Sequence, residues 1–109
     1  MNFRFWFRSL WQRHGPKRRL IIIDGDTPPA PIPSRHVYLC RDDGDDWSAA
    51  MRCPCGCGDD LELMLLSEVK PNWSLKTKDG DTPTLQPSVW RKSGCESHFW
   101  LREGHIHWC

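Results

Sequence analysis

The sequence predicts a small, compact, mainly β domain that zinc stabilises, with a basic aromatic arm at its N-terminus. Short apolar runs alternate with turn residues from residue 36 onward, and no helical periodicity interrupts them. The stretch "CPCGCGDD" at 53–60 places three cysteines at alternate positions. A chain of 109 residues with seven tryptophans holds one modest core, and a domain of this size often needs a covalent or metal staple as well.

The charges divide the chain into a basic start and an acidic remainder. Residues 1–19 contain six bases and no acid, whereas the rest contains nine bases and fourteen acids. Such a division suggests that the two parts of the chain have different functions. An acidic body repels phosphate, which argues against nucleic-acid binding. The basic arm and the tryptophans nevertheless keep a nucleic-acid binder as an alternative.

The pattern of apolar residues predicts a cytoplasmic protein with no transmembrane segment. Arg4 and Arg8 interrupt the apolar residues near the start, so no signal-peptide core is present. The run "LIII" at 20–23 is too short to span a membrane. Stable disulfides are rare in the cytoplasm, and six cysteines there favour a metal site.

We expect residues 1–34 to form an arm and a proline-rich linker outside a domain that spans 35–109. In a helix, one face of the arm would carry Phe3, Phe7, Leu10 and Trp11. That face would suit a membrane surface or a partner protein. The alternatives are a disordered basic arm or an aromatic flap that folds onto its own domain. The prolines at 28, 29, 31 and 33 exclude a helix or a central strand, which predicts an extended linker ending near Arg35.

Six or seven short strands are expected in the domain. "RDDGDDW" at 41–47 is an acidic turn whose spacing does not match an EF-hand, so we expect it to be solvated. Asp79-Gly80 and Glu103-Gly104 are placed to close two tight hairpins. The predicted strands and hairpins are 36–40, 47–53, 60–66, 72–90 and 97–109.

The cysteines favour a zinc site, because tetrahedral zinc takes four soft ligands. Cys53 and Cys57 lie four apart around flexible glycines, and Cys55 between them can join if the turn is sharp. A second pair with C-x2-H spacing, Cys95 and His98, follows about forty residues later. Buried unliganded thiols, redox cysteines and disulfides are the alternatives. Three other candidates, Cys40, His105 and His107, are expected to be a core thiol and two exposed strand histidines.

The ordered motifs resemble a small bacterial family filed as domain of unknown function 6527. They are "MRCPCGCGDDLELMLL", Trp73, "TPTLQPSVW", "GCESHFWLR" and a final G-x-I-x-W-C, and they cover residues 35–109. The resemblance implies a setting among bacterial ubiquitin-like conjugation genes, beside E1-like and E2-like enzymes. It also implies a role as the peptidase that removes the ubiquitin-like protein from its conjugates.

The resemblance also implies which residues form the two sites. Other branches of that family end in Trp-Ala, which argues against Cys109 as an essential ligand. The implied zinc ligands are then Cys53, Cys55, Cys57 and Cys95, with His98 spare.

A spare histidine beside a suitable hydroxyl group predicts a catalytic pair. Ser88 follows Pro87 at a strand end, whereas Ser97 would point to the opposite face from its neighbour His98. We therefore predict a Ser88–His98 dyad, oriented by one of four carboxylates: Asp79, Asp81, Glu96 or Glu103. Alternatively, Ser88 only bonds turn backbone and His98 binds zinc or packs on its strand. The function is then either a zinc-stabilised serine peptidase or a non-catalytic zinc module that binds a modifier or an E2-like enzyme.

Overall fold

The computed structural model describes residues 3–25, 27–91 and 94–109 of the chain. Within these ranges it contains one helix and nine short strands, which confirms the mainly β class. The elements are α1 (Phe3–His14), β1 (Arg19–Asp24), β2 (His36–Asp42), β3 (Asp45–Arg52), β4 (Asp60–Met64), β5 (Ser74–Lys78), β6 (Thr82–Gln86), β7 (Val89–Trp90), β8 (His98–Arg102) and β9 (His105–Trp108).

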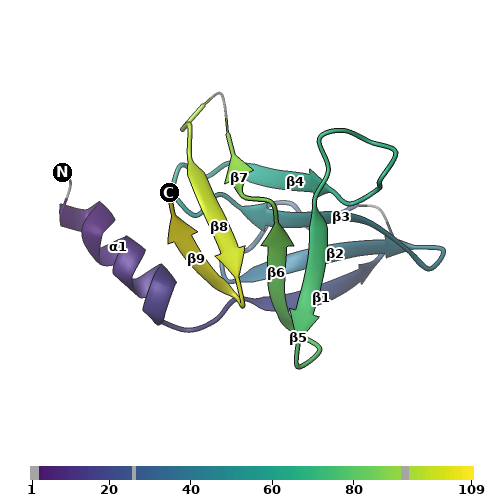
Figure 1. Cartoon of the computed structure of the whole chain (residues 1–109), viewed down its shortest axis with the longest axis horizontal. Coiled ribbons are helices and arrows are strands. Elements are labelled where there is room, and N and C mark those ends of the chain that lie inside the picture. Colours follow the sequence, from purple (N-terminus) through teal and green to yellow (C-terminus); the bar gives the residue numbers. More distant parts are fainter. Residues whose placement is uncertain (1–2, 26, 92–93) are drawn as a thin grey trace.

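The strands form two layers that cross one another (Figure 1). One layer is a four-stranded sheet in the order β1-β2-β3-β4, in which β1 and β2 are parallel and the other pairs antiparallel. The second layer combines the β5-β6 hairpin with the β7-β8-β9 sheet. β6 lies beside the β8-β9 turn, where the Gly104 N–H donates to the Pro83 carbonyl at 2.8 Å.

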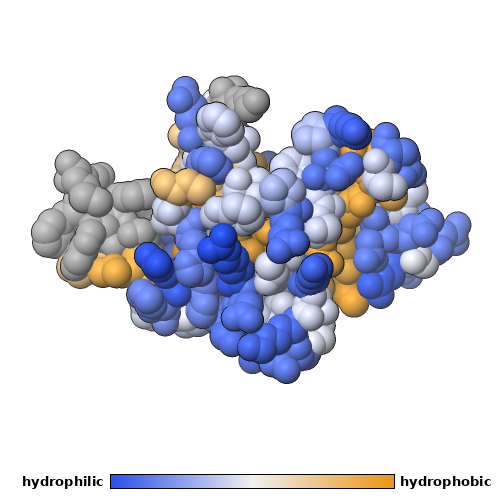
Figure 2. All heavy atoms as spheres, viewed as in Figure 1, coloured by the Kyte–Doolittle hydropathy of each residue, from blue (hydrophilic) through white to orange (hydrophobic). Residues whose placement is uncertain are grey.

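The main core lies between the two layers. Alternate residues of the β8-β9 hairpin point into it, so that Phe99, Leu101 and Ile106 are fully buried. Val37, Met51, Leu61, Leu63 and Leu85 are among the residues that meet them from the other strands. Figure 2 shows mostly hydrophilic residues over the face it displays, with apolar residues visible in the seams between them.

The predicted hairpin turns are present. Asp79 and Gly80 have positive φ angles of 56° and 82°, and Glu103 and Gly104 have 46° and 76°. Two successive residues with positive φ match the right-handed twist of the paired strands. At Gly104 a Cβ atom would also lie 2.6 Å from the carbonyl oxygen of Arg18, so only glycine fits there.

The expected linker contains a strand, which corrects the prediction. Residues Arg19–Asp24 form β1 and pair in parallel with β2, and Ile32 is only 2% exposed in a second small core. The prolines begin at residue 28, so they leave the preceding apolar run free to form an edge strand. The boundary between 1–34 and 35–109 concerns independent folding and stays a prediction.

The arm folds onto the domain as a helical flap, one of the alternatives that the sequence left open. α1 lies against β9 (Figure 1), where the Trp108 indole N–H donates to Gln12 at 2.9 Å. Gln12 in turn donates to the Pro54 carbonyl at 2.6 Å. Trp11 stays 66% exposed. Within the described ranges, no helix has the length and apolar character needed to cross a membrane.

Candidate active site and metal centre

The structure brings Ser88 and His98 together. Ser88 lies between β6 and β7, and His98 is the first residue of β8. The Ser88 Oγ and the His98 Nε2 are 2.9 Å apart, and both residues are half-buried. This distance lies within the range that a nucleophile and its general base require. The predicted pair therefore has the geometry of a dyad, and its catalytic role stays a prediction.

Three contacts that the sequence analysis missed hold this pair. The Trp73 indole N–H donates to the Ser88 carbonyl at 3.3 Å, and the Cys109 backbone N–H donates to the His98 carbonyl at 3.0 Å. Trp90 stacks on the His98 imidazole with 5.1 Å between the ring centroids and 15° between the planes. Trp90 and His98 lie directly opposite each other across β7 and β8. Predicting the register of this strand pair would have revealed the stack.

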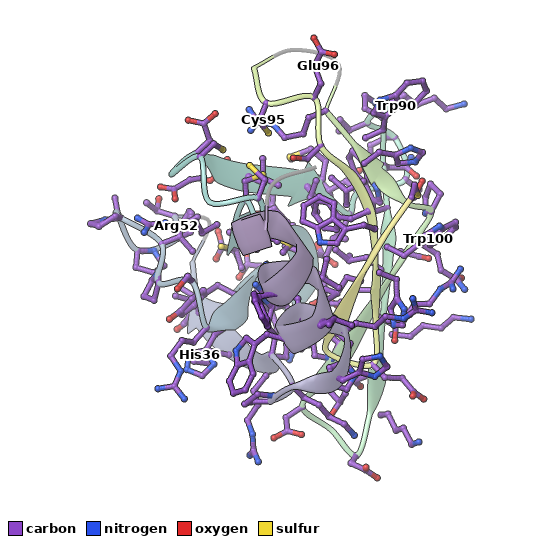
Figure 3. The ribbon with its side chains drawn as sticks, turned by 90° about the vertical axis from the view of Figure 1, so that its left-hand side faces the viewer. His36, Arg52, Trp90, Cys95, Glu96 and Trp100 are labelled. Carbon is purple, nitrogen blue, oxygen red and sulfur yellow. The ribbon has the colours of Figure 1, made fainter. Side chains whose placement is uncertain are left out.

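The four candidate orienting carboxylates lie elsewhere. Asp81 and Glu103 form ion pairs with basic side chains at 3.2 and 3.4 Å. Glu103 follows the far end of β8, roughly 17 Å from His98 at the usual strand rise. Asp79 lies in the turn beyond the far end of β6. Glu96 projects outward at the tip of its loop (Figure 3). Among the groups that the structure describes, the indole of Trp90 is the one stacked on the imidazole of His98.

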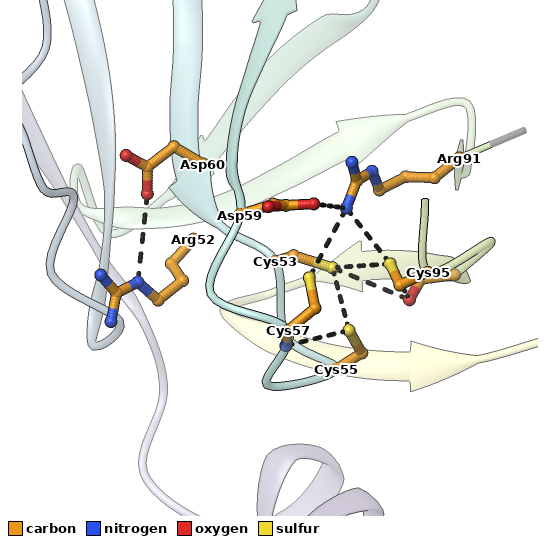
Figure 4. A network of polar contacts seen from close by, with 9 residues as sticks. Arg52, Cys53, Cys55, Cys57, Asp59, Asp60, Arg91 and Cys95 are labelled. Carbon is orange, nitrogen blue, oxygen red and sulfur yellow. Dashed lines mark hydrogen bonds and ion pairs between the residues drawn. The ribbon is translucent and has the colours of Figure 1, made fainter. Parts of the chain in front are cut away.

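The four predicted zinc ligands form one cluster. The Sγ atoms of Cys53, Cys55, Cys57 and Cys95 all lie within 4.8 Å of one another. Cys53 is 3.5 Å from Cys55 and 3.6 Å from Cys95, far longer than a disulfide bond of about 2.05 Å. A tetrahedral Zn–S distance of about 2.3 Å requires sulfur atoms about 3.8 Å apart. The cluster could therefore hold a metal ion such as zinc (Figure 4).

Hydrogen-bond donors surround the sulfur atoms. Arg91 Nη1 lies 3.2 Å from the Cys95 sulfur and 3.6 Å from the Cys57 sulfur, and it pairs with Asp59 at 3.1 Å (Figure 4). Burial acts to raise the pKa of Cys95, but hydrogen bonds with Ser97, Cys55 and Cys53 together lower that pKa to about 6. These contacts stabilise the thiolate form of Cys95, the form that binds metal. The sequence analysis did not identify Arg91 or Ser97 in this role.

The remaining candidates stay outside the four-sulfur cluster. His98 bonds Ser88 instead, and Cys109 is exposed and contributes only its backbone N–H near the dyad. Cys40 is a fully buried core residue, as the sequence predicts. His105 and His107 are half-buried on β9, not exposed as predicted, and His105 bonds a backbone carbonyl of the arm at 2.9 Å. The pKa of His107 is lowered, first by burial and then by nearby cations.

One hairpin connects the metal centre with the dyad. Its first strand, β7, lies between Ser88 and Arg91, and Cys95 lies in the loop just before the second strand, β8, which begins at His98. The Arg91 N–H donates to the Ser97 carbonyl at 2.8 Å between the two sites. A metal ion on Cys95 would therefore fix the hairpin that sets the spacing of Ser88 and His98.

Comparison with known protein families classifies the chain. A family model described as "Bacterial ubiquitination-like system serine protease (BubE)" matches residues 24–109. The chain belongs to the BubE family. The match includes Ser88, His98 and the four clustered cysteines. It supports the expected link to bacterial ubiquitin-like conjugation and to serine protease chemistry. No curated protein and no solved structure matches the BubE-family chain.

Proposed function

We propose that this chain is a deconjugating peptidase of the bacterial cytoplasm that releases a ubiquitin-like protein from its conjugates. Ser88 is the nucleophile and His98 is the general base. The observation that carries the proposal is the 2.9 Å contact between Ser88 Oγ and His98 Nε2. Membership of a serine protease family supports the reaction class.

The first half of the reaction transfers an acyl group to the serine. His98 Nε2 accepts the Ser88 proton while Oγ attacks the carbonyl carbon at the modifier–target junction. The tetrahedral intermediate then collapses, the C–N bond breaks, and His98 gives its proton to the departing amine. The modifier remains on Ser88 as an ester. This role needs the neutral imidazole with its hydrogen on Nδ1, because Nε2 must accept the proton.

The second half of the reaction hydrolyses that ester. His98 accepts a proton from water as the water oxygen attacks the carbonyl carbon. The bond to Oγ then breaks, and His98 returns the proton to Ser88. The products are the free modifier carboxylate and the unmodified target amine, so each proton taken is returned.

The surrounding residues keep the pair aligned during both halves. The Trp90 ring limits rotation of the imidazole, since the two planes lie within 15° of parallel. Trp73 fixes the backbone of Ser88 through its carbonyl group. A displacement of about 1 Å in such a pair can lower the rate about a hundredfold, so these contacts act on the reaction through alignment.

The four cysteines would hold zinc as a structural ion. Zinc bound there would supply a rigid cross-link between the Cys53–Cys57 loop and the hairpin that contains Cys95. Four thiolate ligands complete a tetrahedral site and leave no open position for substrate, unlike a catalytic zinc site. The chemistry therefore belongs to Ser88 and His98. The conjugates would be those formed by the E1-like and E2-like enzymes of the same pathway.

Cleavage of a defined conjugate tests the proposal. A modifier joined to a target through an amide bond should be cut by the wild-type chain and left intact by Ser88→Ala. Ser67→Ala is the matched control, because Ser67 is an exposed serine whose hydroxyl group donates to its neighbour Glu68. Full cleavage by Ser88→Ala would remove Ser88 from the mechanism. Tight binding without cleavage by the wild type would favour the non-catalytic module, for which the exposed Trp90 offers a contact surface.

A further inference from the structure

A cavity of about 1110 Å³ lies on the side of the molecule near the end of α1 and apart from the dyad. Its walls come from the end of α1, the following segment, the first residues of β1 and β2, the end of β3 and the cysteine loop. Two acids, Asp79 and Asp81, line it. Basic side chains outnumber them: Lys17, Arg18, Arg19, Arg35, His36 and Arg52. The cavity therefore has an excess of positive charge.

Strand register places three of these bases in one row. Arg19 is paired with His36 across β1 and β2. Tyr38 is paired with Ala50 across the antiparallel strands β2 and β3. Two residues further along the same register, His36 lies opposite Arg52. Residues directly opposite each other point to the same face, and adjacent strands lie about 4.8 Å apart. Figure 3 shows His36 and Arg52 on the same side of α1. The row forms one continuous basic wall.

Three buried nitrogen atoms of residues that line the cavity lack partners. Arg18 Nε, His36 Nδ1 and Arg52 Nε are buried without a hydrogen-bond partner among the residues that the structure describes. The nearest acid to Arg52, Asp60, is 4.0 Å from Nε and beyond hydrogen-bond distance. Burial also lowers the pKa of Arg18. Unsatisfied buried polar groups are rare in proteins, and the two guanidinium donors along this cavity, with an imidazole nitrogen beside them, indicate a bound acceptor.

An aromatic ring completes the cavity. Trp11 lines it and is 66% exposed, so the indole offers a flat face to a ligand. Tryptophan stacks well on heterocyclic bases, while guanidinium groups bind phosphate through charge-assisted hydrogen bonds. The cavity is slightly larger than the range of about 300–1,000 Å³ typical of small-molecule sites. Its chemistry fits a ligand that combines phosphate groups with a flat ring.

We propose that this cavity binds a nucleotide, with the diphosphate or triphosphate on Arg18, His36 and Arg52 and the base on Trp11. The site is separate from the proposed peptidase centre, because Ser88, His98 and Trp90 do not line the cavity. Binding is therefore measured without reference to cleavage. Failure of one proposal leaves the other standing.

Calorimetric titration of the zinc-loaded full chain tests the site with ATP, ADP, inorganic pyrophosphate and adenosine. ATP and ADP should bind, pyrophosphate should bind more weakly, and adenosine should not bind measurably. Arg52→Gln and His36→Gln should each weaken ATP binding about tenfold, the effect of losing one charged hydrogen bond. Trp11→Ala should weaken ATP binding and leave pyrophosphate unchanged. Arg102→Gln is the matched control, because that guanidinium lies over Trp100 outside the cavity.

Several outcomes would overturn the proposal. ATP that fails to bind the wild type, or that binds Arg52→Gln and His36→Gln as tightly as the wild type, would reject the site. Equal affinity for ATP and pyrophosphate, unaffected by Trp11→Ala, would reject the nucleotide. If a single-stranded oligonucleotide binds and ATP does not, the basic side chains of the cavity would form a nucleic-acid site instead. A melting temperature for each variant confirms that lost binding is not lost folding.

Discussion

The indole of Trp90 lies nearly parallel to the imidazole of His98, with 5.1 Å between the ring centroids. The two residues are paired across β7 and β8, so the sheet itself sets this stack. Trp90 is nevertheless 59% exposed, which means that it contributes little to the core. We therefore expect its main effect to be on the orientation of the histidine.

Replacing Trp90 should therefore lower activity more than stability. Trp90→Ala should reduce kcat/KM by about ten- to a hundredfold, because the imidazole loses its alignment with Ser88. Trp90→Phe retains a ring at this position and should recover most of the loss. Trp47→Ala, which removes another exposed tryptophan on β3, is the control. Unchanged kcat/KM in Trp90→Ala would show that the stack does not orient the base.

Ser88 and His98 should behave as one unit. Ser88→Ala and His98→Ala should lose activity to a similar extent, and the double variant should lose little more, because members of a catalytic unit are not additive. All three variants should retain their metal, since neither residue belongs to the four-sulfur cluster. Metal analysis beside the kinetics checks this. Loss of zinc in His98→Ala would make His98 a ligand and contradict the dyad.

The purified protein should contain about one zinc ion per chain. Structural zinc supplies roughly 10 kcal/mol or more of apparent binding free energy, comparable to the free energy of unfolding of a whole domain. Cys57→Ser and Cys95→Ser should therefore be largely unfolded by circular dichroism. Cys109→Ser, which removes an exposed thiol outside the cluster, should melt like the wild type. A melting curve that strong chelator leaves unchanged would contradict the metal site.

Two truncated chains measure separately how α1 and β1 contribute to the free energy of unfolding. A chain that starts at residue 19 keeps β1, whereas a chain that starts at residue 31 loses it. The shorter chain should lose roughly 2–3 kcal/mol more in its free energy of unfolding, because Leu20 and Ile23 are partly buried in the two cores. Urea unfolding of both chains measures the difference. Equal midpoints would support a domain boundary near residue 35.

Local chemistry made much of the fold and site predictable. The Asp79-Gly80 and Glu103-Gly104 turns follow from the φ angles that those residues accept. The cysteine loop follows from ligand spacing around glycines. Side chains alternate along a strand, which excluded Ser97 as the partner of its neighbour His98 and favoured Ser88. In the structure the Ser88 Oγ lies 2.9 Å from the His98 Nε2. Each of these inferences depends on neighbours in the sequence or on a single strand.

Long-range contacts account for what the sequence analysis missed. The parallel pairing of β1 with β2 joins residues 17 positions apart, such as Arg19 and His36, and nothing local specifies that partner. The Gln12–Trp108 bond joins the two ends of the chain. Arg91 reaches Cys57 only because the hairpin folds over the cysteine loop. Such contacts are decided by the packing of whole elements, so a propensity or a spacing does not reveal them.

Covalent labelling by a fluorophosphonate probe tests the central claim most directly, because the probe reacts with a serine only when a base activates its hydroxyl group. Peptide mass spectrometry of the labelled, zinc-loaded chain should find one adduct, on Ser88. Labelling should be absent in Ser88→Ala, slow in His98→Ala and unchanged in Ser67→Ala. An adduct on Ser97, or a folded and zinc-loaded chain that takes no label, would contradict the Ser88–His98 dyad.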